Sequence, residues 1–156
     1  MWVSFALIVA LFLAAKAAED VYESCAKDTI ESGNHWEHHI LCKVGTFNMQ
    51  DHDSQSLMDG TIKFMNCVFT KMAWMDGSKK ELKVEKIISD LSLETDKKKK
   101  EQIGKCKSTD PEQQNGMKYL ECLLRRPNKS DTGVLSFIKN REPVFFNKFH
   151  CKGVTF

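Results

Sequence analysis

The sequence predicts a small all-α domain of seven or eight short helices. Apolar residues recur three and four positions apart along most of the chain, which is the spacing of a helix with one buried face, and no segment reads as a convincing strand. Three prolines and eight glycines are too few for the many turns of an all-β sandwich. With 42% apolar and 28% charged residues, the chain is globular rather than disordered. A formal charge of +2 gives no global electrostatic reason to expect nucleic-acid binding.

Residues 1–17 are expected to be a removable export signal. The run Met1–Ala15 is apolar and uncharged, is too short to span a bilayer comfortably, and leads into the small-residue cleavage pattern Ala15-Lys16-Ala17. The alternative, a short membrane anchor, is disfavoured because no stop-transfer pattern follows. No other segment has 18 consecutive apolar residues. We therefore expect residues 18–156 to form one secreted domain that is soluble and does not bind membranes.

The first helix is expected to begin at Asp20-Val-Tyr-Glu23, where Glu23 is placed to return a capping-box hydrogen bond, and to end at Gly33. A second short helix follows, capped by Asn34 and stopped by Gly45. The polar, turn-rich stretch 46–60 predicts a loop with at most a partial helical turn.

A longer helix is expected from Thr61 to Asp76-Gly77, where it would carry Cys67. Its apolar residues have helical spacing: Ile62, Met65, Val68, Phe69 and Met72. Two amphipathic helices follow over 82–91 and 94–105, and the second of these is very basic.

Asp110-Pro111-Glu112 is a strong helix start, with a cap, a proline in the first turn and then an acid. That helix would end before Pro127. Its apolar residues are Met117, Leu120, Leu123 and Leu124. A further helix is marked by Leu135, Phe137 and Ile138, and a last short one covers 143–151.

Six cysteines lie in the expected mature chain: Cys25, Cys42, Cys67, Cys106, Cys122 and Cys151. An even number in an exported chain predicts three disulfides, although spacing alone leaves fifteen connectivities open. A zinc site is the alternative, and it is disfavoured because the closest two cysteines are 16 positions apart. Disulfide formation would leave no nucleophilic thiol.

Other residue patterns give little support for catalysis or for a metal site. His35 and His39 stand four apart, but Glu37 falls in the wrong place for the metalloprotease order, and a third ligand would have to be His52 or His150. We favour a solvated face over a metal site. The chain has no nucleophile-elbow, P-loop or dinucleotide-binding pattern and no paired acids with a base, so we expect neither an enzyme nor a cofactor.

The run Lys97–Lys100, with Lys79 and Lys80 nearby in sequence, could bind heparin, anionic lipid or an acidic partner. A solvated helix face is the favoured interpretation. No aromatic residue is interleaved with these lysines, which disfavours single-stranded nucleic acid. The motif Asn128-Lys-Ser130 is a weak candidate for glycosylation.

The cysteine frame resembles that of the insect odorant-binding-protein superfamily, and more closely the short-form salivary D-seven proteins of blood-feeding flies. The first two cysteines are 17 apart, and Lys63 stands where ordinary odorant-binding proteins have a cysteine. The remaining matches are Lys63-Phe-Met-Asn-Cys67, Met75-Asp-Gly77, Ile103-Gly-Lys-Cys106, Tyr119-Leu-Glu-Cys122-Leu-Leu124 and Phe149-His-Cys151-Lys152. The resemblance implies a compact helical bundle around an apolar pocket, with disulfides Cys25–Cys67, Cys42–Cys151 and Cys106–Cys122.

Short-form members typically bind biogenic amines, and a buried ammonium needs carboxylates and an aromatic face. At the positions where the family places its polar amine-binding groups, this chain has Ala26, Gly45, Phe64, Leu120, Ser136 and Lys139. Amine binding is therefore expected to be weak or absent, unless another acid such as Glu121 or Asp131 replaces the missing ones. Phe64, Leu120 and Phe137 either line an apolar pocket for a lipid-like or neutral aromatic ligand or fill the core.

The resemblance thus implies a monomeric, secreted salivary protein that binds a small host mediator and modulates host haemostasis or inflammation. The alternative is a protein-binding inhibitor of host coagulation or platelet function. A relic with neither activity is a third possibility.

Overall fold

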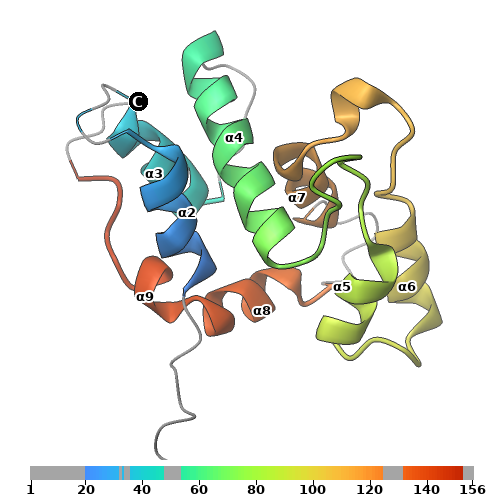
Figure 1. Cartoon of the computed structure of the whole chain (residues 1–156). Coiled ribbons are helices and arrows are strands. Elements are labelled where there is room, and N and C mark those ends of the chain that lie inside the picture. Colours follow the sequence, from blue (N-terminus) through green and yellow to red (C-terminus); the bar gives the residue numbers. More distant parts are fainter. Residues whose placement is uncertain (1–19, 32, 34–35, 48–53, 125–131, 153–156) are drawn as a thin grey trace, which may run out of the picture.

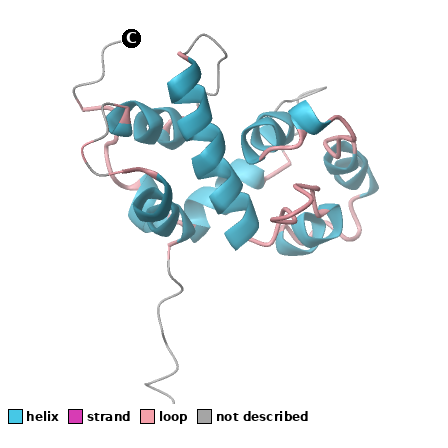
Figure 2. Ribbon diagram, turned by 45° about the horizontal axis from the view of Figure 1, so that its top comes forward, coloured by secondary structure: helices cyan, strands magenta, loops and turns pink. Residues whose placement is uncertain are grey.

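A computed structural model of the chain describes residues 20–31, 33, 36–47, 54–124 and 132–152. In this part of the chain the regular elements are helices, which confirms the predicted all-α class (Figure 2). They are α2 (Val21–Thr29), α3 (Glu37–Gly45), α4 (Gln55–Lys71), α5 (Val84–Asp90), α6 (Lys97–Gly104), the 3₁₀ turn η1 (Pro111–Gln113), α7 (Gly116–Leu124), α8 (Val134–Arg141) and α9 (Pro143–Phe146). The expected export signal and the expected glycosylation site Asn128 lie outside the described residues.

The longest of these helices, α4, runs through the middle of the molecule, and the others pack around it (Figure 1). Helices α2 and α3 lie against one side of α4, and α7 lies against the other. Helices α8 and α9 follow each other along one end, where α8 contacts α7 and α9 contacts α2. Helices α5 and α6 pack on each other at the far edge.

The sequence of α4 explains its central position. Its buried residues recur three and four apart, so that they form one continuous face: Leu57, Thr61, Phe64, Met65, Val68 and Phe69. Trp74 follows the helix and is fully buried, with its indole N–H donating to Asp90 at 2.8 Å. This hydrogen bond satisfies the one polar group of a large buried side chain and ties the end of α4 to α5.

Helices α4 and α7 approach each other closely at Gly116. A Cβ atom at this position would lie 2.3 Å from the carbonyl oxygen of Met65, which is closer than any side chain can come. The Gly116 N–H donates to the Asn66 side chain at 2.7 Å. The two helices can therefore pack in this way only because residue 116 lacks a side chain.

Three disulfides hold the helices together, as predicted. Cys25–Cys67 joins α2 to α4, Cys42–Cys151 joins α3 to the C-terminal segment, and Cys106–Cys122 joins the end of α6 to α7. These are the same three pairs that the family resemblance implies. The sequence separations are 42, 109 and 16 residues, so the second bridge closes the longest loop.

The predicted loop over 46–60 is wrong in its second half, because α4 begins at Gln55 rather than at Thr61. The Ser54 hydroxyl accepts from the Leu57 N–H at 3.4 Å and caps the helix, and Leu57 is buried. Helix α4 also ends earlier than predicted, at Lys71, since the chain turns into a left-handed conformation at Ala73 with φ 57°.

The single helix predicted from Asp110 is also wrong, because the chain forms the short turn η1 and then starts α7 separately. Asp110 caps η1, whereas the Asn115 side chain accepts from the Lys118 N–H at 3.0 Å and caps α7. Two helices are shorter than predicted: α2 ends at Thr29, and α9 does not extend to Cys151.

Candidate functional site

Two carboxylates that are far apart in the sequence meet where the N-termini of α2 and α9 come together. Asp20 caps α2 by accepting from the Glu23 N–H at 3.0 Å, and its other oxygen accepts from the Phe145 N–H of α9 at 3.0 Å. Glu142, which precedes α9, accepts from the Tyr22 N–H of α2 at 3.2 Å. Asp20 therefore caps both α2 and α9, and Glu142 adds a second acceptor at the start of α2, so these hydrogen bonds join the N-termini of the two helices.

Burial raises the pKa of Glu142 to about 6, and a hydrogen bond with the Asp20 carboxyl group and the charge of Asp20 act in the same direction. The Arg141 guanidinium lies 3.1 Å from the second Glu142 oxygen. All four oxygens of the pair thus have partners within the chain, and none is left for an incoming ammonium group.

Tyr22 lies beside this acid pair in the middle of an aromatic cluster. It is fully buried, and its ring centroid lies 5.9 Å from that of Phe64, 5.2 Å from that of Phe145 and 4.9 Å from that of Phe146. Burial, followed by the nearby charges of Glu142 and Asp20, raises the pKa of Tyr22 far above its usual range. Among the described residues its hydroxyl has no hydrogen-bond partner.

The three residues expected to line an apolar pocket lie in or against the packed core. Phe64 and Leu120 are completely buried within it, and Phe137 packs against it with its ring stacked on Trp74 at 5.7 Å. Phe64, Leu120 and Phe137 are absent from the linings of the two clefts described below. Their position in or against the core is thus established, and their role in lining a ligand pocket stays a prediction.

The other substituted amine-site positions divide into two groups. Ser136 and Lys139 are exposed on α8, so polar groups at these positions would face solvent here. Ala26 and Gly45 lie near the C-terminal segment instead. A side chain at Gly45 would meet the His150 ring at 3.0 Å, so His150 occupies the space that a larger residue would need.

Glu121 and Asp131 were the two acids that could replace the substituted amine-binding groups, and neither supplies a free carboxylate in the described structure. Glu121 lies on α7, and its carboxylate is 3.5 Å from the Lys118 ammonium group. Asp131 lies outside the described residues. Sequence reasoning missed Glu142 as a buried acid, although an acid directly before Pro143 at a helix start was a usable signal.

A cleft of about 460 Å³ opens between α2, α3 and the C-terminal segment. Its apolar lining residues are Ala26, Ile30, Leu41 and Phe145, with charged residues and His150 completing the wall. The His150 ring stacks on Phe145 with centroids 4.2 Å apart, and one of its ring nitrogens is hydrogen-bonded to the Phe145 carbonyl at 2.8 Å. The Cys42–Cys151 disulfide fixes this segment against α3.

The carboxylates of this cleft are also engaged by the chain itself. Glu23 pairs with Lys148 at 2.7 Å, which replaces the capping-box bond predicted for Glu23. Glu37 accepts from the Gly33 N–H at 3.3 Å. The cleft therefore offers an apolar and aromatic surface, and one oxygen of each of its two carboxylates already has a partner in the chain.

A second cleft, of about 600 Å³, lies between the loop after α4 and the ends of α5 and α6. Its lining is mainly charged, with three lysines and three acids: Lys79, Lys83, Lys107, Asp76, Glu81 and Glu85. Hydrogen bonds to its carboxylate, first from the Lys79 N–H and then from the Ser78 hydroxyl and N–H, lower the pKa of Asp76 to about 2. This cleft suits an apolar ligand poorly.

The described residues contain no group of three histidines, cysteines or acids that could hold a metal ion. Of the histidines considered as ligands, His35 and His52 lie outside the described part of the chain, and the His39 ring packs edge-on against Trp36 at 5.5 Å. Within the same residues, no helix has the length and apolar character needed to cross a bilayer.

An all-helical, disulfide-linked bundle with an apolar interior is the architecture of an insect odorant-binding protein, and the sequence comparison agrees. The model of the PBP/GOBP family matches residues 16–126, and the chain belongs to this family. Its members are binding proteins rather than enzymes. The chain is also 28% identical to an Aedes aegypti protein named neutrophil recruitment protein, over 99% of this chain and 96% of that protein.

Proposed function

We propose that this protein is a secreted, monomeric carrier of a small, largely apolar host mediator, and that it binds biogenic amines weakly or not at all. The observation that carries the proposal is the character of the buried positions 64 and 120. Where amine-binding members of the family have polar groups, this chain has Phe64 and Leu120, both completely buried. These two positions in the core therefore offer an ammonium group no polar partner to replace its lost hydration.

The cleft between α2, α3 and the C-terminal segment is our proposed ligand site. Its volume of about 460 Å³ suits a small organic molecule, and Phe145 and His150 offer ring faces for stacking. Because Glu23 and Glu37 are already bonded within the chain, a lipid-like or neutral aromatic ligand fits this cleft better than a cation does.

A fluorescence binding assay tests this site. A neutral naphthalene fluorophore should show saturable binding to the wild type, and Ala26→Trp should weaken it by at least about tenfold because the indole fills the cleft. Val84→Trp, which places the same bulk in the second cleft, is the matched control and should bind as the wild type does. Equal binding by all three proteins would place the ligand elsewhere.

Isothermal titration with serotonin and histamine tests the second half of the proposal. We expect no binding in the submicromolar range, because each carboxylate of the cleft and of the α2–α9 junction is held by the chain's own donors. Submicromolar affinity for either amine contradicts this expectation.

The proposed role outside the molecule is modulation of a host response, as a secreted component of saliva. The family membership and the three disulfides support secretion, and the name of the Aedes aegypti relative supports an effect on host inflammation. N-terminal sequencing of the secreted protein should begin at Ala18, after removal of residues 1–17. The purified protein should then change neutrophil migration. A prolonged plasma clotting time without ligand binding would instead support the coagulation or platelet inhibitor.

A further inference from the structure

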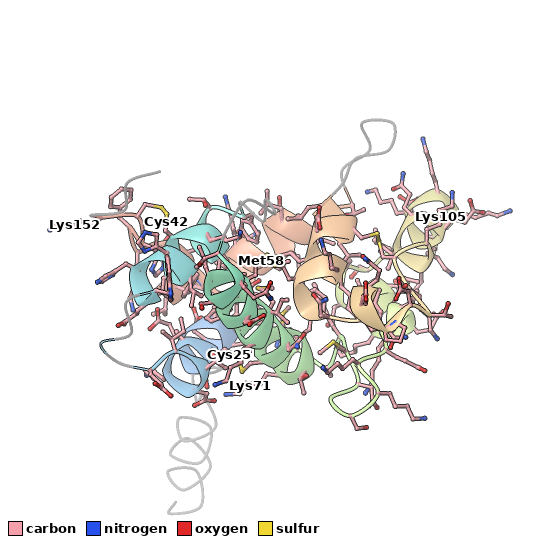
Figure 3. All side chains as sticks on the ribbon, turned by 90° about the horizontal axis from the view of Figure 1, so that it is seen from above. Cys25, Cys42, Met58, Lys71, Lys105 and Lys152 are labelled. Atoms are coloured by element: carbon pink, nitrogen blue, oxygen red, sulfur yellow. A yellow bond between two sulfur atoms is a disulfide. The ribbon has the colours of Figure 1, made fainter. Side chains whose placement is uncertain are left out.

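Residues 79–107 form a basic lobe that is built from the end of the loop after α4, together with α5 and α6. The lobe contains ten lysines and six acidic residues, a net charge of +4, although the whole chain carries only +2. The rest of the chain is therefore acidic, with a net charge of −2. Figure 3 shows Lys105 of this lobe projecting at one end of the molecule, with Lys152 at the opposite end.

Part of the negative charge within the basic lobe is used internally. Asp90 accepts from the Trp74 indole and pairs with Lys86. Asp96 caps α6 through the Lys99 N–H at 3.0 Å and lies 3.6 Å from the Lys99 ammonium group. In the described part of the chain, Lys97, Lys98 and Lys105 are exposed and form no ion pair.

The placement of these lysines opposes helix stability. Lys97–Lys100 occupy the first turn of α6, which contains no acidic residue. Cations at a helix N-terminus are disfavoured by the helix dipole, and four adjacent like charges repel one another. A bound polyanion would remove both penalties, because it would meet the lysines and the positive end of the dipole together.

A strained turn presents further lysines on the same lobe. Lys80 adopts φ 55°, a left-handed conformation that side chains avoid, and its carbonyl accepts from the Tyr119 hydroxyl at 2.8 Å. Asp76 accepts from the Ser78 and Lys79 N–H groups at 3.0 and 2.8 Å. The turn therefore holds Lys79 and Lys80 in a fixed position next to the cleft that also contains Lys107.

The composition of the basic lobe favours one class of polyanion. Residues 79–107 contain no aromatic side chain to stack on nucleic-acid bases and no arginine to clamp phosphate in a bidentate manner. The large exposed apolar side chains of the described residues, Val144 and Phe149, both lie in the C-terminal segment. The lobe thus lacks the apolar anchor that bilayer insertion or a stable protein interface would use.

We propose that the basic lobe binds a sulfated polysaccharide of the heparin class, through Lys97, Lys98 and Lys105 with support from the turn at Lys79 and Lys80. Hydrated ammonium groups spread over the surface match the repeating sulfates of a linear polymer, which needs no deep pocket. This site is separate from the proposed ligand cleft between α2 and α3, so either can exist without the other.

Binding to immobilised heparin tests the proposal. The wild type should bind at 0.15 M NaCl, and Lys97→Gln/Lys98→Gln/Lys105→Gln should lose about tenfold or more in affinity. The control Lys27→Gln/Lys139→Gln/Lys152→Gln removes the same charge from exposed lysines outside the lobe and should lose less than about threefold. The slope of log affinity against log salt should become shallower by about two for the lobe variant only.

Three results would overturn the proposal: no wild-type binding at this salt concentration, equal losses in the two triple variants, or tighter binding to phosphatidylserine vesicles than to heparin. Desulfated heparin should bind at least about tenfold more weakly than heparin. If the lobe variant fails to fold, acetylation of the wild type provides a second readout. Heparin should then protect Lys97, Lys98 and Lys105 but not Lys27, Lys139 or Lys152, and uniform protection contradicts the assignment.

Discussion

The acid pair at the α2–α9 junction makes a specific prediction about stability and pH. The folded-state pKa of Glu142 is about 6, against 4.5 for an unperturbed glutamate. A carboxyl group whose folded pKa is raised stabilises the fold when it is protonated. That contribution is fully present below pH 4.5 and is lost as the pH rises through 6. The shift corresponds to at most about 2 kcal/mol, since one pKa unit is worth about 1.4 kcal/mol.

The substitution Glu142→Gln isolates this contribution. The glutamine is neutral at every pH, and its carbonyl oxygen can still accept from the Tyr22 N–H, while its amide group replaces the oxygen that faces the Arg141 guanidinium. We expect the variant to gain up to about 2 kcal/mol relative to the wild type between pH 4 and pH 7.5. Because the Arg141 guanidinium lies 3.1 Å away and favours the charged form, the measured gain should fall below this limit.

Urea denaturation of both proteins at pH 4 and pH 7.5 measures the effect, because the other titrating groups cancel in the difference between variant and wild type. Glu121→Gln, which also removes one partly buried carboxylate, is the control. Between pH 4 and pH 7.5, the unfolding free energy relative to the wild type should rise more for Glu142→Gln than for Glu121→Gln. The reasoning is refuted if the difference between wild type and Glu142→Gln is the same at both pH values, or if acidification favours the glutamine variant.

Two further predictions concern packing and the disulfides. Gly116→Ala should destabilise the protein by about 2 to 3 kcal/mol in urea denaturation, because its Cβ would lie 2.3 Å from the Met65 carbonyl oxygen. Gly104→Ala, whose Cβ has no neighbour within 4 Å, should be neutral or stabilising by up to about 1 kcal/mol, and equal losses would contradict the packing argument. Replacing Cys42–Cys151 by alanines should cost roughly 5 kcal/mol and replacing Cys106–Cys122 roughly 3, because the bridges close loops of 109 and 16 residues. The reverse order would show that native-state strain, not loop length, sets their contributions.

Local patterns were sufficient to predict most helices of this chain. Helices α5, α6 and α8 lie where apolar periodicity indicates them, and Asp20 caps α2 as its position suggests. Helical hydrogen bonds join residues four apart, so a short stretch of sequence contains nearly all the information that a helix needs. The start of α4 was not predicted, because its first turn is mostly polar in sequence. Only the burial of Leu57 shows that this turn packs against the core.

The arrangement of the candidate site depended on contacts between distant residues. Tyr22 and Glu142 are 120 positions apart, and no pattern within either helix predicts that one caps the other. The roles of Phe64 and Leu120 were left open between pocket and core by the sequence, since an apolar side chain suits both. Only the packing of α4 between α2 and α7 placed both residues in the core and left a cleft at the C-terminal segment.

The sequence by itself thus determined the helical class and the charge of the basic lobe, because both follow from residues that are neighbours in the chain. Tertiary structure alone decided that helices α4 and α7 touch at Gly116 and that His150 occupies the space beside Gly45. It also decided that Asp20 accepts from the Phe145 N–H and that Glu142 accepts from the Tyr22 N–H. These contacts form only when distant segments are brought together, and their geometry is set by the volume and polarity of every side chain packed between them.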